Sequence, residues 1–463
     1  MPTHRRLSRW PAPSLPFVVL CMLLGVLWLA GGASRSDVWG QIVVRSAAWL
    51  ALIVAIVFAK RPAGQAMGAA GWFLLAAIVL TVLQLVPLPP AVWQNLPGRD
   101  LFAEAAVASG QSQPWRPWSI VPGATANALS SLIVPVTILI LLRALEPSEH
   151  ARLPGLVLVL VFAATVIGLL QFSAGGLDNP FVNDSPGEVA GTFANRNHFA
   201  LFVAIGCLIA PVWAFMREDQ SQWRAPAALG LVLLFVLTIL ASGSRAGILL
   251  GTLAMALGLL IAHRRITRAL RHYPRWVLPA LVGGAVAMVV ILVLVSIAAD
   301  RAVSIQRMMA IDAGQDMRTR GLPTVLGMIA AYFPAGAGFG GFDPLFRIHE
   351  PLNVLKFTFF NHAHNDFLEI ALDAGLAGLL LLSAAILWWA WASVGAWRAR
   401  LEMHHAVPRL GSAILLLILV ASAFDYPGRT PIIMAIIMIA ATWLGTAGET
   451  SRGSALPQRD QHL

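Results

Sequence analysis

Long apolar stretches, separated by short polar turns, make up most of the chain. Each stretch approaches the ~20 residues that an α-helix needs to cross the hydrocarbon core of a bilayer. The pattern therefore predicts an all-α, polytopic transmembrane protein with about twelve spans. The expected spans are residues 17–33, 42–59, 69–88, 126–145, 154–172, 197–216, 226–241, 246–262, 276–299, 367–395, 407–424 and 430–447.

One long polar segment, residues 300–365, breaks this pattern between two late spans. It contains arginines and a glycine-rich run, and it ends in Asn-His-Ala-His-Asn, directly before the next span. The rest of the chain has no stretch with the composition of a soluble domain. We therefore interpret residues 1–463 as a single integral membrane domain, and we expect much of its chemistry in this loop.

The composition agrees with a chain surrounded by lipid. Hydrophobic residues make up 58% of the sequence and charged residues only 12%, whereas a soluble domain carries about a quarter charged residues. The formal net charge of +10 rests almost entirely on arginine. Because cytoplasmic loops of membrane proteins are enriched in basic residues, we expect no nucleic-acid partner. The two cysteines, Cys21 and Cys207, lie in apolar stretches and indicate neither a disulfide nor a metal site.

The distribution of arginine predicts the orientation in the membrane. Basic residues are enriched on alternate loops, most strongly at residues 264–275, and such loops face the cytoplasm. Both termini are then cytoplasmic, residues 89–125 and 300–365 lie outside, and we expect a multi-pass protein of the inner membrane. The basic N-terminus could also begin a cleaved signal peptide, but a retained first span fits better because another span follows at once.

A polar group formed by Asn195, Asn197 and His198 stands at the outer end of a predicted span. Its amide and imidazole groups could bind a sugar or a phosphate. Asparagine is equally suited to cap the helix that begins here, since its side chain accepts a hydrogen bond from a free backbone N–H. The sequence leaves both interpretations open.

Two further outer turns carry charge. Arg245 lies in Ala-Ser-Gly-Ser-Arg-Ala-Gly, without an acidic neighbour in sequence. Its planar guanidinium suits an anion such as phosphate, and we favour this role over that of a snorkelling arginine at the interface. The last outer turn contains Asp425 and Arg429, which could pair with each other or line the same cavity.

The long outer loop contains two further arginines, Arg318 and Arg320. Either one alone could be an ordinary solvated charge. The glycine-rich run that follows, Pro334–Phe342, lacks the Lys-Ser or Lys-Thr of a phosphate-binding loop, so a nucleotide site is not predicted.

Residues suited to catalysis are densest where the next span begins. His362, Asp366, Glu369 and Asp373 recur at helical spacing and should share one helix face, turned toward the protein interior or a wet cavity. Asp366 and Glu369 also fit a capping box. Histidine is a natural general base near neutral pH. The His-x-His pair could bind zinc, but no third ligand has a convincing spacing, so we expect no metal.

Taken in order, these motifs resemble those of the O-antigen ligase and polymerase superfamily. The resemblance covers roughly residues 120–440 and rests on Gly-Thr-Phe-Ala-Asn-Arg-Asn-His, the Ser-Arg-Ala-Gly turn, the glycine-rich loop and Ala-His-Asn-Asp-Phe-Leu-Glu. Its members are polytopic glycosyltransferases that use polyprenyl-diphosphate-linked glycans. The resemblance implies inverting, metal-independent transfer, without a cofactor, on the outer face of the inner membrane.

The resemblance also implies roles for individual residues. The histidine that acts as base on the acceptor hydroxyl matches His364, with His362 as a second candidate. The arginines that hold the lipid diphosphate match Arg245 and Arg320, with Arg318 as an additional candidate. The residues then expected to contact the glycan or the acceptor are Asn195, Asn197, His198, Asn365 and Asp366.

The donor and acceptor remain open at this level. The implied partners are membrane lipid, a polyprenyl-diphosphate-linked glycan, and a saccharide, lipid A-core or protein acceptor, in lipopolysaccharide or exopolysaccharide synthesis. The main alternative is a secondary transporter of a small anion such as bicarbonate. A transporter should place its charges near the bilayer midplane, often within inverted repeats; here the charges lie near the outer surface and no repeat is evident.

Overall fold

The computed structural model describes residues 12–59, 67–174, 178–183, 188–216, 223–271, 317–352, 360–398 and 406–453, together with residues 274, 276, 279, 283, 284, 287 and 355. Its helices are α1 (Leu15–Ala30), α2 (Trp39–Phe58), α3 (Ala69–Leu83), α4 (Pro90–Trp93), α5 (Asp100–Ala108), α6 (Pro122–Ser131), α7 (Ile133–Arg143), α8 (Pro147–His150), α9 (Leu153–Ala174), α10 (Arg196–Ala214), α11 (Arg224–Ala241), α12 (Arg245–Leu270), α15 (Met317–Tyr332), α16 (Phe342–His349), α17 (Asp366–Arg398), α18 (Ala406–Ser422) and α19 (Pro431–Gly453). A 3₁₀ helix, η3 (Pro427–Arg429), and two short strands, β1 (Pro87–Leu88) and β2 (Arg116–Pro117), complete the described elements.

The predicted all-α membrane architecture is confirmed in its main features. Seven helical stretches of the described chain are long and apolar enough to cross a membrane: Trp39–Phe58, Pro122–Arg143, Pro147–Ser173, Arg196–Ala214, Arg224–Ala241, Arg245–Ala269 and Asp366–Arg398. Four shorter apolar helices coincide with other predicted spans: Leu15–Ala30, Ala69–Leu83, Ala406–Ser422 and Pro431–Thr446. The predicted span 276–299 lies largely outside the described residues, so the count of twelve stays a prediction.

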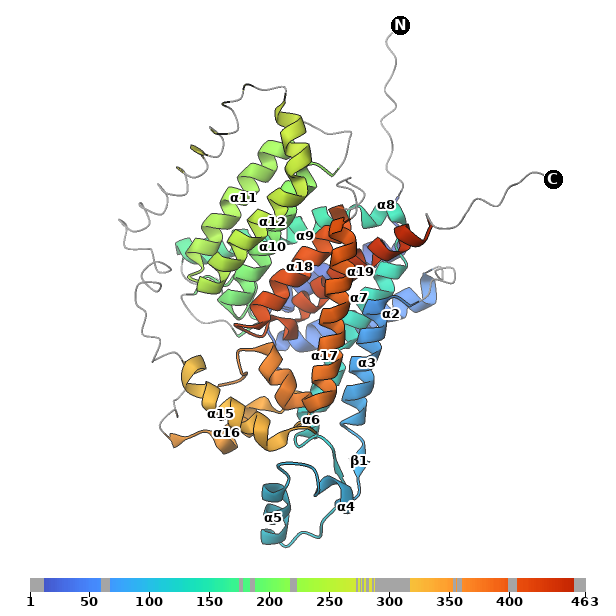
Figure 1. Ribbon diagram of the computed structural model, residues 1–463, viewed down its shortest axis with the longest axis vertical. Helices are drawn as coiled ribbons and strands as arrows, with labels where there is room; N and C mark the ends of the chain where they lie inside the picture. The colour runs from blue at the N-terminus through green and yellow to red at the C-terminus, as the bar shows by residue number, and fades with distance from the viewer. Residues whose placement is uncertain are drawn as a thin grey trace, which may run out of the picture.

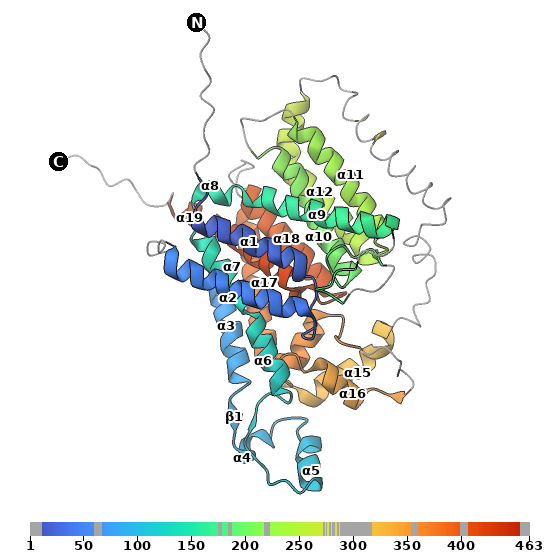
Figure 2. The same cartoon turned by 180° about the vertical axis from the view of Figure 1, so that it is seen from behind.

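Helix α10 forms the centre of the bundle. Its residues from His198 to Val212 are all buried, and it packs against α9, α11, α12 and α18. Figures 1 and 2 show α10, α11 and α12 as one group and α17, α18 and α19 as a second group beside it. The uniform burial explains why this helix is apolar on every side, with polar residues confined to its outer end.

Polar side chains define where the helices begin. The Asn195 Oδ1 atom accepts a hydrogen bond from Asn197 N at 2.8 Å at the start of α10. Ser244 Oγ does the same for Gly247 N, at 2.9 Å, at the start of α12. At the start of α17 the capping oxygen belongs to Asn365, which accepts from Leu368 N at 3.1 Å. The expected capping box of Asp366 and Glu369 is therefore wrong, and both carboxylates are free for other contacts.

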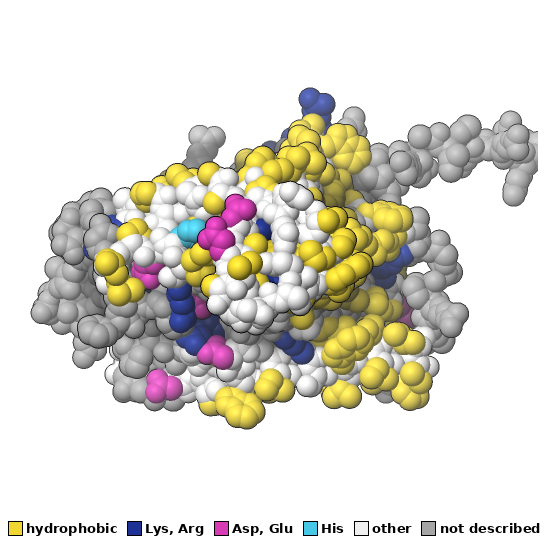
Figure 3. All heavy atoms as spheres, turned by 90° about the horizontal axis from the view of Figure 1, so that it is seen from below, with side chains coloured by type: hydrophobic (Ala, Val, Ile, Leu, Met, Phe, Trp, Pro, Cys, Tyr) yellow, Lys and Arg dark blue, Asp and Glu magenta, His cyan; other side chains and the backbone are white. Residues whose placement is uncertain are grey.

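The elements outside the bundle gather at one end, the lower end in Figure 1. There β1 pairs antiparallel with β2, α4 and α5 extend beyond them, and α15 and α16 enclose a small apolar core that includes Tyr332, Phe342, Phe346 and Phe360. Seen from this end, charged side chains of both signs lie among apolar ones (Figure 3). We refer to this end as the outer end, following the predicted orientation.

The glycine-rich run connects the outer elements to the bundle through a break in α17. Gly375, inside α17, has φ 53° and ψ −139°, outside the helical region. A Cβ at Gly375 would lie 2.1 Å from the Pro334 carbonyl oxygen, so only glycine fits. Across the break, Leu376 N donates to Pro334 O at 2.9 Å and Gly338 N donates to Asp373 O at 2.8 Å. The glycine-rich run thereby fixes the outer part of α17.

Candidate active site

Asp425, in the turn between α18 and η3, is the centre of a buried polar network. Its Oδ2 accepts from Asn197 Nδ2 at 2.7 Å and from Asn195 Nδ2 at 3.1 Å. Its Oδ1 lies 3.1 Å from His364 Nδ1 and 3.7 Å from His198 Nε2. The network thus joins the start of α10, the end of the outer loop and the last outer turn.

The surroundings keep Asp425 ionised. Burial alone would raise the pKa of its carboxyl, but the hydrogen bonds and charges of His198 and His364 hold this pKa well below its usual range. A carboxylate that accepts from Nδ1 orients an imidazole ring and leaves the lone pair on Nε2.

His364 presents this free nitrogen to its surroundings. Its Nε2 has no protein hydrogen-bond partner in the described part of the chain, and the side chain is 18% exposed. The backbone at His364 has φ 51°, a left-handed conformation that is uncommon for a residue other than glycine. Such conformations gather at functional sites, where surrounding contacts hold them in place. Here the ring lies against Phe360 and Tyr426, at centroid distances of 5.1 and 5.0 Å.

His362 forms a second histidine–carboxylate pair. Its Nδ1 lies 2.8 Å from Glu369 Oε1, and Glu369 Oε2 accepts from the Ala363 backbone N–H at 3.0 Å. Its Nε2 lies 3.4 Å from Ser34 Oγ. Each of the two histidines therefore has one nitrogen oriented by a buried carboxylate and the other turned elsewhere.

Tyr426 packs against all three histidine rings of this region. Its ring centroid lies 4.1 Å from that of His362 and 5.0 Å from those of His198 and His364. Burial raises the pKa of the Tyr426 hydroxyl, so the side chain is neutral at physiological pH. It acts as an apolar wall that keeps the two histidine–carboxylate pairs apart.

Arg429 neutralises the acidic face of α17. Its Nη1 lies 3.3 Å from Glu369 Oε1, its Nη2 lies 3.2 Å from Asp373 Oδ2, and its Nε lies 3.6 Å from Asp366 Oδ1. Burial alone would lower the pKa of Arg429, but the three carboxylates hold it above its ordinary value. The sequence correctly predicts a shared face for these acids but wrongly places His362 on it, because α17 begins only at Asp366. The considered pairing of Arg429 with Asp425 is also wrong.

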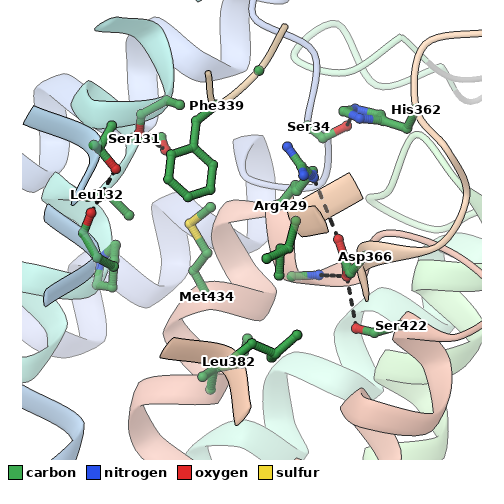
Figure 4. A pocket seen from close by; sticks show the side chains of 18 of the residues that line it. Ser34, Ser131, Leu132, Phe339, His362, Asp366, Leu382, Ser422, Arg429 and Met434 are labelled. Atoms are coloured by element: carbon green, nitrogen blue, oxygen red, sulfur yellow. Dashed lines mark hydrogen bonds and ion pairs between the residues drawn. The ribbon is translucent and has the colours of Figure 1, made fainter. Parts of the chain in front are cut away.

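A cavity of about 890 Å³ lies beside these groups. Its polar lining includes Ser34, His362, Asp366, Ser422 and Arg429, which Figure 4 shows on one side. Ser131 and Leu132 lie on the opposite side, Met434 lies between the two sides, and Leu382 lies below. The cavity therefore joins a polar region to an apolar one, which suits a ligand with a polar head and a hydrocarbon tail. A polar pocket of about 60 Å³, lined by Ser34, Asn195, His198 and Tyr426 among others, adjoins it.

Residues 229–383 match the O-antigen ligase family model. This match confirms the resemblance to the O-antigen ligase and polymerase superfamily and supports glycan transfer of the ligase or polymerase type. Together with the apolar helices it identifies a membrane protein. None of the curated proteins matches the chain.

The O-antigen ligase match contains both candidate base histidines and the predicted arginines, but the structure places these residues differently. Arg245 is the first residue of α12 and is exposed; its neighbour Ser244 donates to Asn197 Oδ1 at 2.8 Å, so it adjoins the Asp425 network. Arg320 lies on α15 and is half-buried. Neither arginine belongs to the residues that line the large cavity. The side chain of Arg318 lies outside the described part of the chain.

Most of the residues predicted to contact the glycan or the acceptor form hydrogen bonds within the protein. Asn195 and Asn197 use their side-chain NH₂ groups on Asp425, and His198 Nδ1 lies 3.1 Å from Thr430 Oγ1. Asn365 caps α17 and donates to Ala423 O at 3.1 Å. Of the predicted contacts, Asp366 lines the large cavity and Asn195 and His198 line the small pocket.

Several site residues lie outside the motifs found in the sequence. Ser34 lacks any charge or spacing that would single it out. Tyr426 lies in the last outer turn next to Asp425, where only the two charged residues were singled out. Arg45, which lines the cavity from α2, does have a signal, because a charged residue within an apolar span needs a reason. In the described chain no group of three or more His, Cys, Asp or Glu side chains is arranged to hold a metal ion; the three carboxylates of α17 surround Arg429 instead.

Proposed function

We propose that the protein transfers a glycan from a polyprenyl-diphosphate carrier to an acceptor hydroxyl on the outer face of the inner membrane. The observation that carries this proposal is the His364–Asp425 pair, whose Nε2 has no partner among the described residues, two residues from His362, which lines the amphipathic cavity. The family match supports the reaction class. The predicted topology, with both termini cytoplasmic, gives the site access to lipid-linked glycan after its translocation.

The chemistry follows from these groups. The acceptor hydroxyl gives its proton to His364 Nε2 as its oxygen attacks the anomeric carbon. The bond from that carbon to the diphosphate oxygen breaks, and polyprenyl diphosphate leaves with the electron pair. Asp425 stabilises the imidazolium that forms. Attack opposite the leaving group inverts the anomeric configuration.

The amide groups divide between positioning and recognition. Asn195 and Asn197 hold Asp425 and act as positioning residues for His364. Asn361, which lines both the large cavity and the small pocket, is a better candidate to contact the acceptor sugar. Arg245 and Arg320 remain candidates for the diphosphate at the outer end of the site. The polyprenyl-diphosphate carrier and the hydroxyl-bearing acceptor are both parts of this proposal. The proposal covers a ligase and a polymerase alike.

The carboxylates nearest to the cavity do not require a divalent ion. Asp366, Glu369 and Asp373 already share the positive charge of Arg429. We therefore propose metal-independent transfer, with arginine supplying the countercharge. Purified protein should turn over lipid-linked donor in excess chelator. Activity that vanished with chelator and returned with Mg²⁺ would contradict metal-independent transfer.

The test of the whole proposal is the variant His364→Ala in purified, reconstituted protein supplied with lipid-diphosphate-linked glycan and acceptor. Transfer should fall by about 100-fold or more, the usual contribution of a general base. His349→Ala is the matched control, because His349 is an exposed histidine of the outer elements that pairs with Tyr332 OH at 2.9 Å. It should leave the rate unchanged. Full transfer by His364→Ala would assign the base to His362 or remove histidine from the reaction.

A further inference from the structure

Arg45 is a charged residue within a membrane-spanning helix. It lies in the second turn of α2, about 9 Å along the helix axis from Trp39 at the rise of an α-helix. Most of the residues that follow it in α2 are apolar. A charge in this position is costly, and such residues usually serve a ligand or a transport path. Arg45 precedes the segment that matches the ligase family, residues 229–383.

The guanidinium of Arg45 is held by neutral groups only. Its Nη1 donates to Ser130 Oγ of α6 at 2.7 Å, and its Nη2 donates to Gln41 Oε1 at 3.1 Å. Its Nε is buried and has no hydrogen-bond partner. No carboxylate of the described residues pairs with it. These contacts hold the half-buried side chain of Arg45 between α2 and α6, where it lines the large cavity.

Arg45 differs in this respect from the other arginines that line the large cavity. Arg35 pairs with Asp37 and Arg347 pairs with Asp343. Arg429 is surrounded by three carboxylates. Among the described lining residues, only Arg45 therefore contributes an uncompensated positive charge.

The charge distribution directs an anion to one side of the cavity. On the side of Arg429, the carboxylates of Asp366, Glu369 and Asp373 outnumber the single guanidinium. The negative charge there would repel a phosphate. The α2–α6 side carries Arg45, with the hydroxyl of Ser131 and the amide of Asn127 also lining the cavity. Figure 4 shows Ser131 across the cavity from Arg429 and Asp366. A charge-assisted hydrogen bond from a guanidinium to phosphate is stronger in such partly buried surroundings than in water.

The remaining wall suits a hydrocarbon chain. It includes Phe73, Leu74 and Ala77 of α3, Leu132 next to α6, and Leu382 and Ile386 of α17. The volume of about 890 Å³ lies at the upper end of the range for ligand pockets. The cavity thus offers an isolated positive charge beside an apolar surface within the outer half of the bundle.

We infer that Arg45 binds the phosphate of a polyprenyl lipid whose tail lies on the apolar wall of α3 and α17. The identification of this lipid as the glycan carrier rests on the proposed function; the phosphate-lipid site itself does not. Arg45 would hold the carrier through the phosphate, leaving the far end of the head group free to reach the histidines.

The test measures binding without an acceptor, so that it is independent of transfer. Purified protein in detergent is titrated with polyprenyl phosphate, and bound lipid is quantified by native mass spectrometry. Arg45→Gln should weaken binding by about ten-fold or more, a loss that corresponds to ~1.4 kcal/mol. Arg45→Lys should retain part of the affinity. Arg347→Gln is the matched control and should bind as the wild type does, because Arg347 lines the same cavity but is already paired.

A second variant tests the tail site with the charge intact. Ala77→Phe should also weaken polyprenyl phosphate binding, because its ring would occupy the apolar wall. Equal affinity of Arg45→Gln and wild type, or an undiminished affinity of Ala77→Phe, would overturn the inference. If inorganic phosphate displaced polyprenyl phosphate, the site would bind a free anion and not a lipid. If phosphatidylglycerol displaced it at equal concentration, the site would not be specific for a polyprenyl lipid. A protein that binds the lipid through Arg45 but transfers no glycan would overturn only the proposed function.

Discussion

The Asp425 carboxylate lies 3.1 Å from Nδ1 of His364, although 61 residues separate the two in sequence. This contact connects a residue of the family-matched segment with one beyond it. It gives the imidazole of His364 a defined orientation, which the proposed general base requires. The orientation of this loop histidine therefore depends on the last outer turn.

Asp425→Asn is expected to lower the transfer rate by about 100-fold, because an amide cannot stabilise the imidazolium and its NH₂ favours the wrong tautomer of His364. The rate is measured with saturating donor and acceptor, and the amount of folded protein is checked by size-exclusion chromatography. Asp343→Asn, which breaks the exposed pair with Arg347, serves as control. A wild-type rate for Asp425→Asn would show that this pair is structural only.

Arg429→Met should destabilise the protein strongly, by about 3–5 kcal/mol, because it leaves three carboxylates of α17 without their buried partner. Thermal unfolding in detergent measures the loss. Adding Asp373→Asn to Arg429→Met should recover part of the stability, since it removes one of the uncompensated charges. A melting temperature unchanged by Arg429→Met would mean that water, not Arg429, neutralises this face.

The dependence of stability on pH should reveal the depressed pKa of Asp425. A carboxyl whose folded pKa lies below the unfolded value of about 3.9 stabilises the protein at all higher pH values. This contribution is lost only as the pH falls through the folded pKa. The stability advantage of the wild type over Asp425→Asn should therefore not decrease as the pH falls from about 8 to 5. A difference that shrank between neutral pH and pH 5 would contradict the assigned environment.

The orientation can be tested with reporter fusions. A fusion at Ala330, in α15, should report an outer location, and a fusion at Arg268, near the end of α12, should report the cytoplasm. The reason is the excess of arginine on the loops around Arg268. Equal signals from the two fusions would refute the topology and with it the proposed access to lipid-linked glycan.

Hydrophobic patterning predicts most of the helices because the bilayer imposes a length and a composition on every span. Helical spacing also predicts the shared face of Asp366, Glu369 and Asp373, which the structure confirms. The partner of this face, Arg429, could not be assigned, because spacing carries no information between helices. The pairing of Asn195 and Asn197 with Asp425 joins residues about 230 positions apart, and only the packing of α10 against α18 brings them together.

Arg45 illustrates a different limit. Its position within an apolar span was visible in the sequence, but its meaning depends on which other arginines are already paired. Arg35, Arg347 and Arg429 all pair with carboxylates, and Arg45 pairs with none of the carboxylates that the structure describes. A charge becomes a binding feature only when the fold leaves it uncompensated.

The break at Gly375 divides α17 into two mechanical units. The short outer unit carries the acids that hold Arg429 and orient His362, and the glycine-rich run fastens it to the outer elements. The long inner unit spans the lipid. The direction of the outer unit is therefore set by its hydrogen bonds to the glycine-rich run and not by the axis of the spanning unit. The acids that hold Arg429 and orient His362 take their positions from the outer elements.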